Sequence, residues 1–216
     1  MSITQQYIKD IMITLNLYFK EVNFPLNYSN PFELIVATII SAQCSDKRVN
    51  QITKILFKRY KTIEDYANAN TYEFIKCIQS AGLFTKKTKY IISTAKLITT
   101  RFDGHIPYTF KELLSLPGIG RKTANIILNK CFKIYEGIAV DTHVVRIANI
   151  LDFTKHQNPI IVEKDLMAII PKKYWNNFSF LIQNLGKTIC KARNKNHLIC
   201  PILQICKYYN RMQNLL

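Results

Sequence analysis

Acidic residues are scarce in this chain of 216 residues, because 14 Asp and Glu stand against 30 Lys and Arg and leave a formal net charge of +16. Such an excess of positive charge indicates a polyanionic partner, of which nucleic acid is the simplest. An anionic membrane surface is the competing partner, but the basic residues are spread along the chain rather than gathered in one amphipathic helix. We therefore expect a nucleic-acid-binding protein without a membrane partner.

Long apolar runs and a secretion signal are also missing. No stretch approaches the roughly 20 apolar residues that a membrane span needs, and polar residues interrupt the first segment, Met1-Ser-Ile-Thr-Gln-Gln. The six cysteines are therefore expected in a reducing compartment, as free thiols or metal ligands rather than disulfides. These absences predict a cytoplasmic protein.

Signals for β-strands are lacking as well, since no alternating runs are joined by a hairpin turn and no low-complexity linker divides the chain. Apolar residues recur instead at helical spacing. The apolar run 32–43 favours a buried helix, although its β-branched residues leave a strand open. The sequence predicts an all-α fold, with further helices over about 4–22, 46–60, 70–80, 85–101, 160–169 and 172–190.

A short stretch rich in glycine interrupts the helical pattern at Leu116-Pro-Gly-Ile-Gly-Arg-Lys-Thr-Ala-Asn125. Proline ends a helix, and the glycines let another backbone come close. The next helix then begins with outward-pointing N–H groups, an anion site suited to a phosphate. Arg121 and Lys122 lie in its first turn, where the helix dipole disfavours cations. The glycines fit neither a P-loop nor a dinucleotide-binding motif, because they lie between two helices.

Asp141 is a second polar anchor, because it follows an apolar run and precedes Thr142-His-Val-Val. Its side chain can cap the helix that starts there. The alternative is a functional carboxylate held near Lys122.

In this order, the motifs resemble the endonuclease III family of bifunctional DNA glycosylases with a helix-hairpin-helix. The resemblance covers nearly the whole chain: Ser41-Ala-Gln43 with Asp46, Gly82-Leu83, the stretch 116–125, the stretch 140–146 and the cysteine-bearing tail. It implies two helical domains, a central one over 24–134 that carries the hairpin and a second one that joins 1–23 to 135–216 and ends in a metal-cluster loop. The active site would then lie at the hairpin and the cleft between these domains.

The resemblance implies that Lys122 is the nucleophile. Its amine would attack C1′ of a damaged nucleoside and form a Schiff base after base loss, and β-elimination would then cut the strand 3′ to the abasic site. Asp141 would relay protons and stabilise the cationic sugar. The implied substrates are oxidised pyrimidines in double-stranded DNA, and we expect a monomer that associates with the nucleoid.

A base inside the duplex must be flipped out before it can be removed. The resemblance makes Leu83 a wedge between bases and lets Gln43 fill the vacated space. It implies contacts with the DNA backbone for Gly118, Gly120, Arg121 and His143. A monovalent cation on carbonyl groups of the hairpin is also implied.

The tail departs from the family's pattern. Members often end in C-x6-C-x2-C-x5-C, which holds a [4Fe–4S] cluster, whereas this chain has Cys190, His197, Cys200 and Cys206 at these positions. Imidazole replaces thiolate in some iron–sulfur centres, so one interpretation is a cluster with His197 as a ligand. Loss of the cluster and a zinc ion in a Cys3His site are the other two.

Two other functions match parts of the pattern. Monofunctional adenine glycosylases lack the lysine after the hairpin and use a glutamate in the segment where this chain has Ser41-Ala-Gln43. A non-catalytic hairpin module that only binds DNA needs neither Lys122 with Asp141 nor the pair Gln43 and Leu83. We therefore expect a glycosylase with AP-lyase activity.

The net charge of +16 generates a first prediction. The apparent affinity for duplex DNA should fall steeply as salt rises, and linearly on a log–log plot, because phosphate contacts release counterions from DNA. Fluorescence anisotropy of a labelled duplex measures this dependence. A flat response between low and moderate salt would contradict an interface dominated by phosphates.

Overall fold

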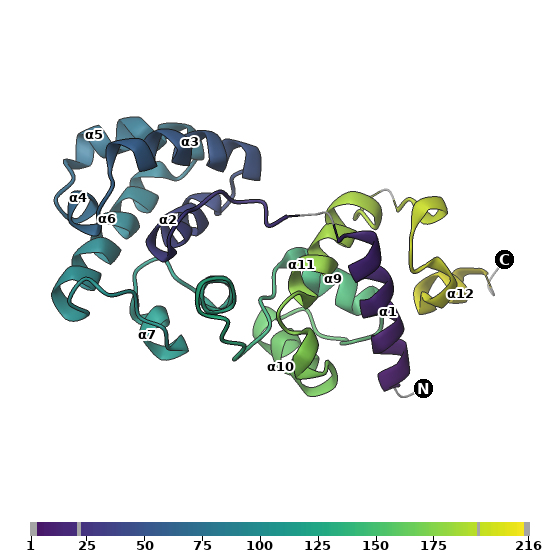
Figure 1. Ribbon diagram of the computed structural model, residues 1–216. Coiled ribbons are helices and arrows are strands. Elements are labelled where there is room, and N and C mark those ends of the chain that lie inside the picture. The colour runs from purple at the N-terminus through teal and green to yellow at the C-terminus, as the bar shows by residue number, and fades with distance from the viewer. Residues whose placement is uncertain (1–3, 21–22, 194, 214–216) are drawn as a thin grey trace. The chain divides into compact units, whose positions relative to one another are not determined.

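The computed structural model describes residues 4–20, 23–193 and 195–213, and the chain divides into two compact units. We call Phe24–Ile134 the central unit, and Met1–Asn23 together with Tyr135–Leu216 the terminal unit. Both are built from helices (Figure 1). The described residues form no strand, and one isolated bridge joins Cys190 to Lys195. The all-α fold predicted from the sequence is confirmed.

The central unit is organised around a helix that is buried on every side. In α2 (Pro31–Ser41), every residue from Leu34 to Ile40 is buried, as an apolar run without a polar face requires. Asn30 caps it by accepting the backbone N–H of Glu33 at 2.9 Å, so this run is a helix and the strand alternative is wrong. Around it lie α3 (Asp46–Arg59), α4 (Ile63–Ala67), α5 (Thr71–Ile78), the 3-10 turn η1 (Gln79–Ala81), α6 (Phe84–Arg101), α7 (Phe110–Ser115), α8 (Arg121–Ile127) and the π-turn η2 (Leu128–Phe132).

Helix α6 connects most of this unit. It packs against α2, α4, α5 and η1, and Ile91, Ala95 and Ile98 on its inner face are buried. The same face carries Lys87 and Thr94, which are also buried. Residues spaced by three or four positions share one side of a helix, so these polar groups enter the core in line with the apolar ones.

The terminal unit is built from segments at both ends of the chain. Its α1 (Gln5–Tyr18) buries Ile8, Ile11 and Leu15 in a core shared with α9 and α11. No helix in the described part of the chain is long and apolar enough to cross a membrane. The remaining elements of this unit are α9 (Thr142–Ile150), α10 (Pro159–Ile169), η3 (Lys172–Tyr174), α11 (Phe178–Asn184), the π-turn η4 (Leu185–Ile189), η5 (His197–Ile199), η6 (Leu203–Ile205) and α12 (Lys207–Gln213).

The predicted helix over 172–190 is wrong in its first part. A 3-10 turn follows Pro171, and the indole N–H of Trp175 donates to the carbonyl of Ile170 at 2.9 Å. The backbone of this stretch is bonded in the 3-10 pattern, with the Trp175 backbone N–H donating to the Lys172 carbonyl at 3.1 Å, and the α-helix begins only at Phe178. The short helices α4 and α12 were not expected from the periodicity, because each is too short to show it.

Candidate functional site

The hairpin between α7 and α8 exposes backbone on both sides of one buried anchor. Gly118 adopts φ 79°, a left-handed conformation that favours glycine, and Gly120 precedes α8 with an extended backbone. Both glycines are exposed, whereas Ile119 between them is buried in the core. The loop is therefore fixed by its apolar residue and presents its backbone to solvent.

Two residues of helix α6, Tyr90 and Thr94, contact this hairpin. A Cβ atom on Gly118 would lie 2.8 Å from Cδ2 of the Tyr90 ring, closer than real side chains approach. The hydroxyl of buried Thr94 donates to the carbonyl oxygen of Pro117 at 2.8 Å. Glycine at 118 is thus required twice, by its backbone angle and by the ring beneath it.

The two cations at the start of α8 are both half-buried. The Arg121 guanidinium lies over the Phe110 ring, 4.8 Å from its centroid, and so packs back on α7 through a cation–π contact. Lys122 follows it in the first turn. The hairpin therefore places its lysine directly beside an exposed stretch of backbone.

Four non-glycine residues described in the central unit adopt left-handed conformations: Asp103, Lys133, and the two expected DNA contacts, Gln43 at φ 54° and Leu83 at φ 50°. Each costs about 1 kcal/mol or more, and such strain is concentrated at functional positions. Gln43 is exposed and Leu83 is 56% exposed, so Leu83 is not a core leucine. Leu83 is also the N-cap of α6 and provides no side-chain cap, although polar residues are strongly preferred there.

Asp141 and His143 belong to the terminal unit. Asp141 is the N-cap of α9, and its Oδ1 accepts the backbone N–H of Val144 at 2.9 Å. His143, in the first turn of this helix, is half-buried, and its Cβ lies 3.3 Å from the position of a Cβ built on Gly186. Both residues proposed for catalysis thus stand at the amino end of a helix, Lys122 inside α8 and Asp141 directly before α9.

The four expected metal ligands each stand at the boundary of a short turn. Cys190 follows η4, His197 begins η5, Cys200 ends the same turn, and Cys206 ends η6. Backbone hydrogen bonds link these positions: Cys200 N–H donates to the His197 carbonyl at 3.0 Å. Short turns therefore determine where each of the four side chains lies in the tail.

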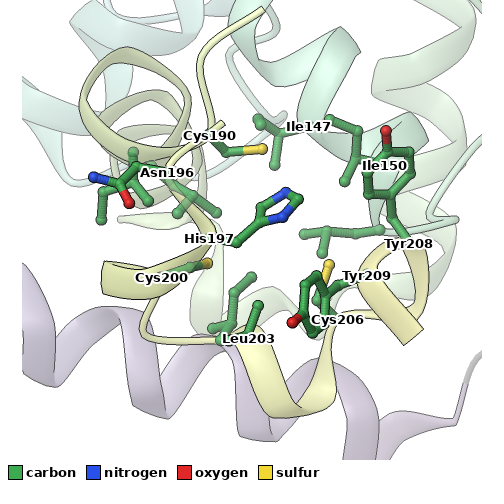
Figure 2. A pocket seen from close by; sticks show the side chains of 14 residues that line it. Ile147, Ile150, Cys190, Asn196, His197, Cys200, Leu203, Cys206, Tyr208 and Tyr209 are labelled. Carbon is green, nitrogen blue, oxygen red and sulfur yellow. The ribbon is translucent and has the colours of Figure 1, made fainter. Parts of the chain in front are cut away.

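These donors line one pocket together with Ile147, Leu151 and Leu185. Figure 2 shows the His197 ring in the middle of the pocket, with Cys190 and Cys206 on either side. The ring also makes an edge contact with Tyr209, at 5.1 Å between centroids. Burial raises the pKa of the Cys190 and Cys200 thiols, and Cys206 raises both further, whereas the Arg146 guanidinium acts in the opposite sense on Cys190.

The four donors line one pocket without forming, in the part of the chain that the structure describes, a binding group for a single metal ion. Among the described residues, no three His, Cys, Asp or Glu side chains converge as one metal ion would require. A [4Fe–4S] cluster takes one ligand on each iron, so its ligands surround a shared space rather than a single point. Three sulfur donors and one imidazole line a common pocket here, with the His197 ring in its middle.

Arg146 ties the start of the tail to α9. Its guanidinium donates to the carbonyl oxygens of Cys190 and of Gly186, the latter at 3.0 Å. These carbonyls lie near the carboxyl end of a helix, where a cation is favourable. Sequence analysis did not single out this residue, although it follows Asp141 and His143 within one short motif.

Comparisons with known proteins agree on one family. A family model described as HhH-GPD superfamily base excision DNA repair protein matches residues 36–172. The Endonuclease III of Synechocystis sp. is 40% identical over 206 residues, which are 95% of this chain and 94% of that protein. The Endonuclease III of Rickettsia felis is 43% identical over 185 residues, 86% of each. A solved structure of a trapped Endonuclease III–DNA covalent intermediate matches with a TM-score of 0.90 and 35% identity, over 98% of this chain and 100% of that one.

The hairpin contacts predict that an alanine destabilises the protein at Gly118 but not at Gly120. Gly118→Ala should destabilise the protein by about 1–3 kcal/mol, because the new methyl group overlaps the Tyr90 ring and the backbone is left-handed. Gly120→Ala is the matched control and should change the unfolding free energy by less than about 0.5 kcal/mol, since no atom lies within 4 Å of its added Cβ. Denaturant unfolding measures both, and equal effects would contradict the close approach of Tyr90.

Proposed function

The chain belongs to the endonuclease III family of the HhH-GPD superfamily, and from this membership we propose how its residues divide the work of base excision. It is a bifunctional DNA glycosylase and AP lyase, and its partner is DNA. One observation carries the proposal: Lys122 lies in the first turn of a helix that follows an exposed, tightly supported hairpin. The backbone N–H groups of the hairpin and the lysine could therefore contact the same stretch of DNA.

Lys122 is the nucleophile in this proposal. Its neutral amine attacks C1′ of the damaged nucleoside, and the base leaves with the electron pair of the glycosidic bond and takes up a proton. Opening of the sugar ring gives the Schiff base. Loss of a proton from C2′ then expels the 3′ phosphate, which cuts the strand by β-elimination.

Asp141 relays protons and stabilises the cationic sugar. Its N-cap bond with the backbone N–H of Val144 orients the carboxylate. Such a carboxylate can accept a proton or stabilise developing positive charge. We propose that Asp141 and Lys122 act on the same nucleotide.

The DNA contacts follow from the exposed turns. Leu83 would insert between bases, and Gln43 would fill the space of the flipped nucleotide, which offsets a few kcal/mol of unstacking. The backbone at Gly118 and Gly120 would contact phosphates, with Arg121 and His143 near the same strand. We further propose that carbonyl groups of the hairpin bind a monovalent cation and that the substrates are oxidised pyrimidines. The protein would act as a monomer in the cytoplasm, associated with the nucleoid.

The tail is proposed to hold a [4Fe–4S] cluster through Cys190, His197, Cys200 and Cys206. Support comes from their shared pocket and from the three thiols, which are the usual ligands of such clusters. When bound, the cluster would cross-link the turns of the tail, because metal binding and folding are coupled in small loops. Lys191 and Arg193, both exposed, lie on the segment that it would close.

The role of Lys122 is tested by trapping the Schiff base with borohydride on a duplex that contains an oxidised pyrimidine. Lys122→Ala should abolish the covalent complex, because no primary amine remains at this position, and should leave DNA binding in place. Lys111→Ala removes an exposed lysine of α7 and should trap like the unaltered chain. Undiminished trapping by Lys122→Ala would refute the assignment.

The ligand role of His197 is tested by iron and sulfide analysis and by visible absorption of anaerobically purified protein. His197→Ala should make the cluster labile, since one iron loses its ligand, and His197→Cys should make it more robust, because thiolate is the usual donor. Equal cluster content and lifetime in both variants would exclude His197 as a ligand. Protein with neither iron nor zinc and a folded tail would exclude the metal centre altogether.

A further inference from the structure

Lys87 is a buried charge that the proposed chemistry does not use. It lies on the inner face of α6 and is 3% exposed. Lysine is almost never buried to this extent without a partner, because removing an ammonium group from water is costly. Its location therefore needs a reason other than solubility.

The partner of Lys87 belongs to the turn that presents Leu83. The Lys87 ammonium donates to the carbonyl oxygen of Ala81 at 2.7 Å, and the Lys87 backbone N–H donates to the carbonyl of Leu83 at 3.1 Å. Ala81 and Leu83 flank Gly82, which is also left-handed at φ 61°. One residue thus bonds to the backbone on both sides of Gly82.

The turn that presents Gln43 follows a helix that packs on α6. Burial lowers the pKa of the Lys87 ammonium. Cys44 follows Gln43 directly, and its N–H donates to the Ser41 carbonyl at 3.1 Å. Helix α6 packs on α2, which ends at Ser41, and on η1. Helix α6 is thus a neighbour of both segments, and its Lys87 ammonium bonds to the one that presents Leu83.

We propose that Lys87 is a positioning residue for base flipping, which holds the Gly82–Leu83 turn in the geometry that enters the duplex. The proposal rests on the wedge role of Leu83 in the proposed function. A side chain that separates bases must keep its position against the stacking energy of the duplex. Leu83 is 56% exposed and makes no side-chain cap bond at the start of α6. The charge-assisted bond to Ala81, shielded from water, supplies this resistance.

The test compares excision from two duplexes that differ only at the position opposite the lesion. In one, the oxidised pyrimidine is paired with a normal base, and in the other it faces an abasic-site analogue, so that less pairing must be broken. Lys87→Met, which keeps the volume and removes the charge, should slow excision on the order of 10- to 100-fold on the paired duplex and much less on the unpaired one. Lys96→Met, at an exposed position of the same helix, controls for loss of positive charge and should not change this ratio.

Leu83→Ala and the double variant complete the cycle. If Lys87 acts through Leu83, the double variant should be no slower on the paired duplex than the slower single variant. The role of Lys87 would be overturned if the rate losses of the two single variants multiplied in the double variant. It would also be overturned if Lys87→Met lost activity equally on both duplexes. Either result would leave the wedge role of Leu83 intact. An undiminished Leu83→Ala variant would instead remove the wedge, and the role of Lys87 with it. If Lys87→Met does not fold by circular dichroism, Lys87→Gln is taken through the same pair of duplexes, with the same ratio expected.

Discussion

The contact between α6 and the hairpin is the constraint on which the central unit depends. Tyr90 leaves no room for a side chain at Gly118, and Thr94 bonds to the carbonyl that precedes it. One turn earlier, Lys87 bonds to the carbonyl before the Gly82–Leu83 turn. A single helix therefore fixes the backbone proposed to meet phosphates and the side chain proposed to enter the base stack. Their relative positions are set by the spacing of residues on one helical face.

Helix α9 has a corresponding part in the terminal unit. It begins with the Asp141 cap, and one turn later Arg146 bonds to the carbonyls of Gly186 and Cys190. The carboxylate proposed for catalysis and the first proposed ligand of the cluster are thus attached to the same helix. The proposed metal centre and the proposed catalytic carboxylate are therefore connected through α9.

Patterns that depend on local chemistry could be predicted from the sequence. The helical repeat gave the all-α fold, and the position of Asp141 before Thr142 indicated the cap that the structure contains. Tertiary contacts could not be predicted. A lysine at position 87 looks like a surface charge until its bond to the carbonyl of Ala81 is known. The signal for Lys87 was present only as a cation on the apolar face of α6.

The identity of the lysine that becomes attached to DNA tests the account most directly. The unaltered chain is trapped with borohydride on a damaged duplex and digested, and the peptide that carries the DNA remnant is sequenced by mass spectrometry. The account predicts one modified residue, Lys122, in the first turn after the hairpin. Attachment at any other lysine, including Lys87 or Lys130, would contradict it, because the hairpin would then hold a phosphate contact and not the nucleophile.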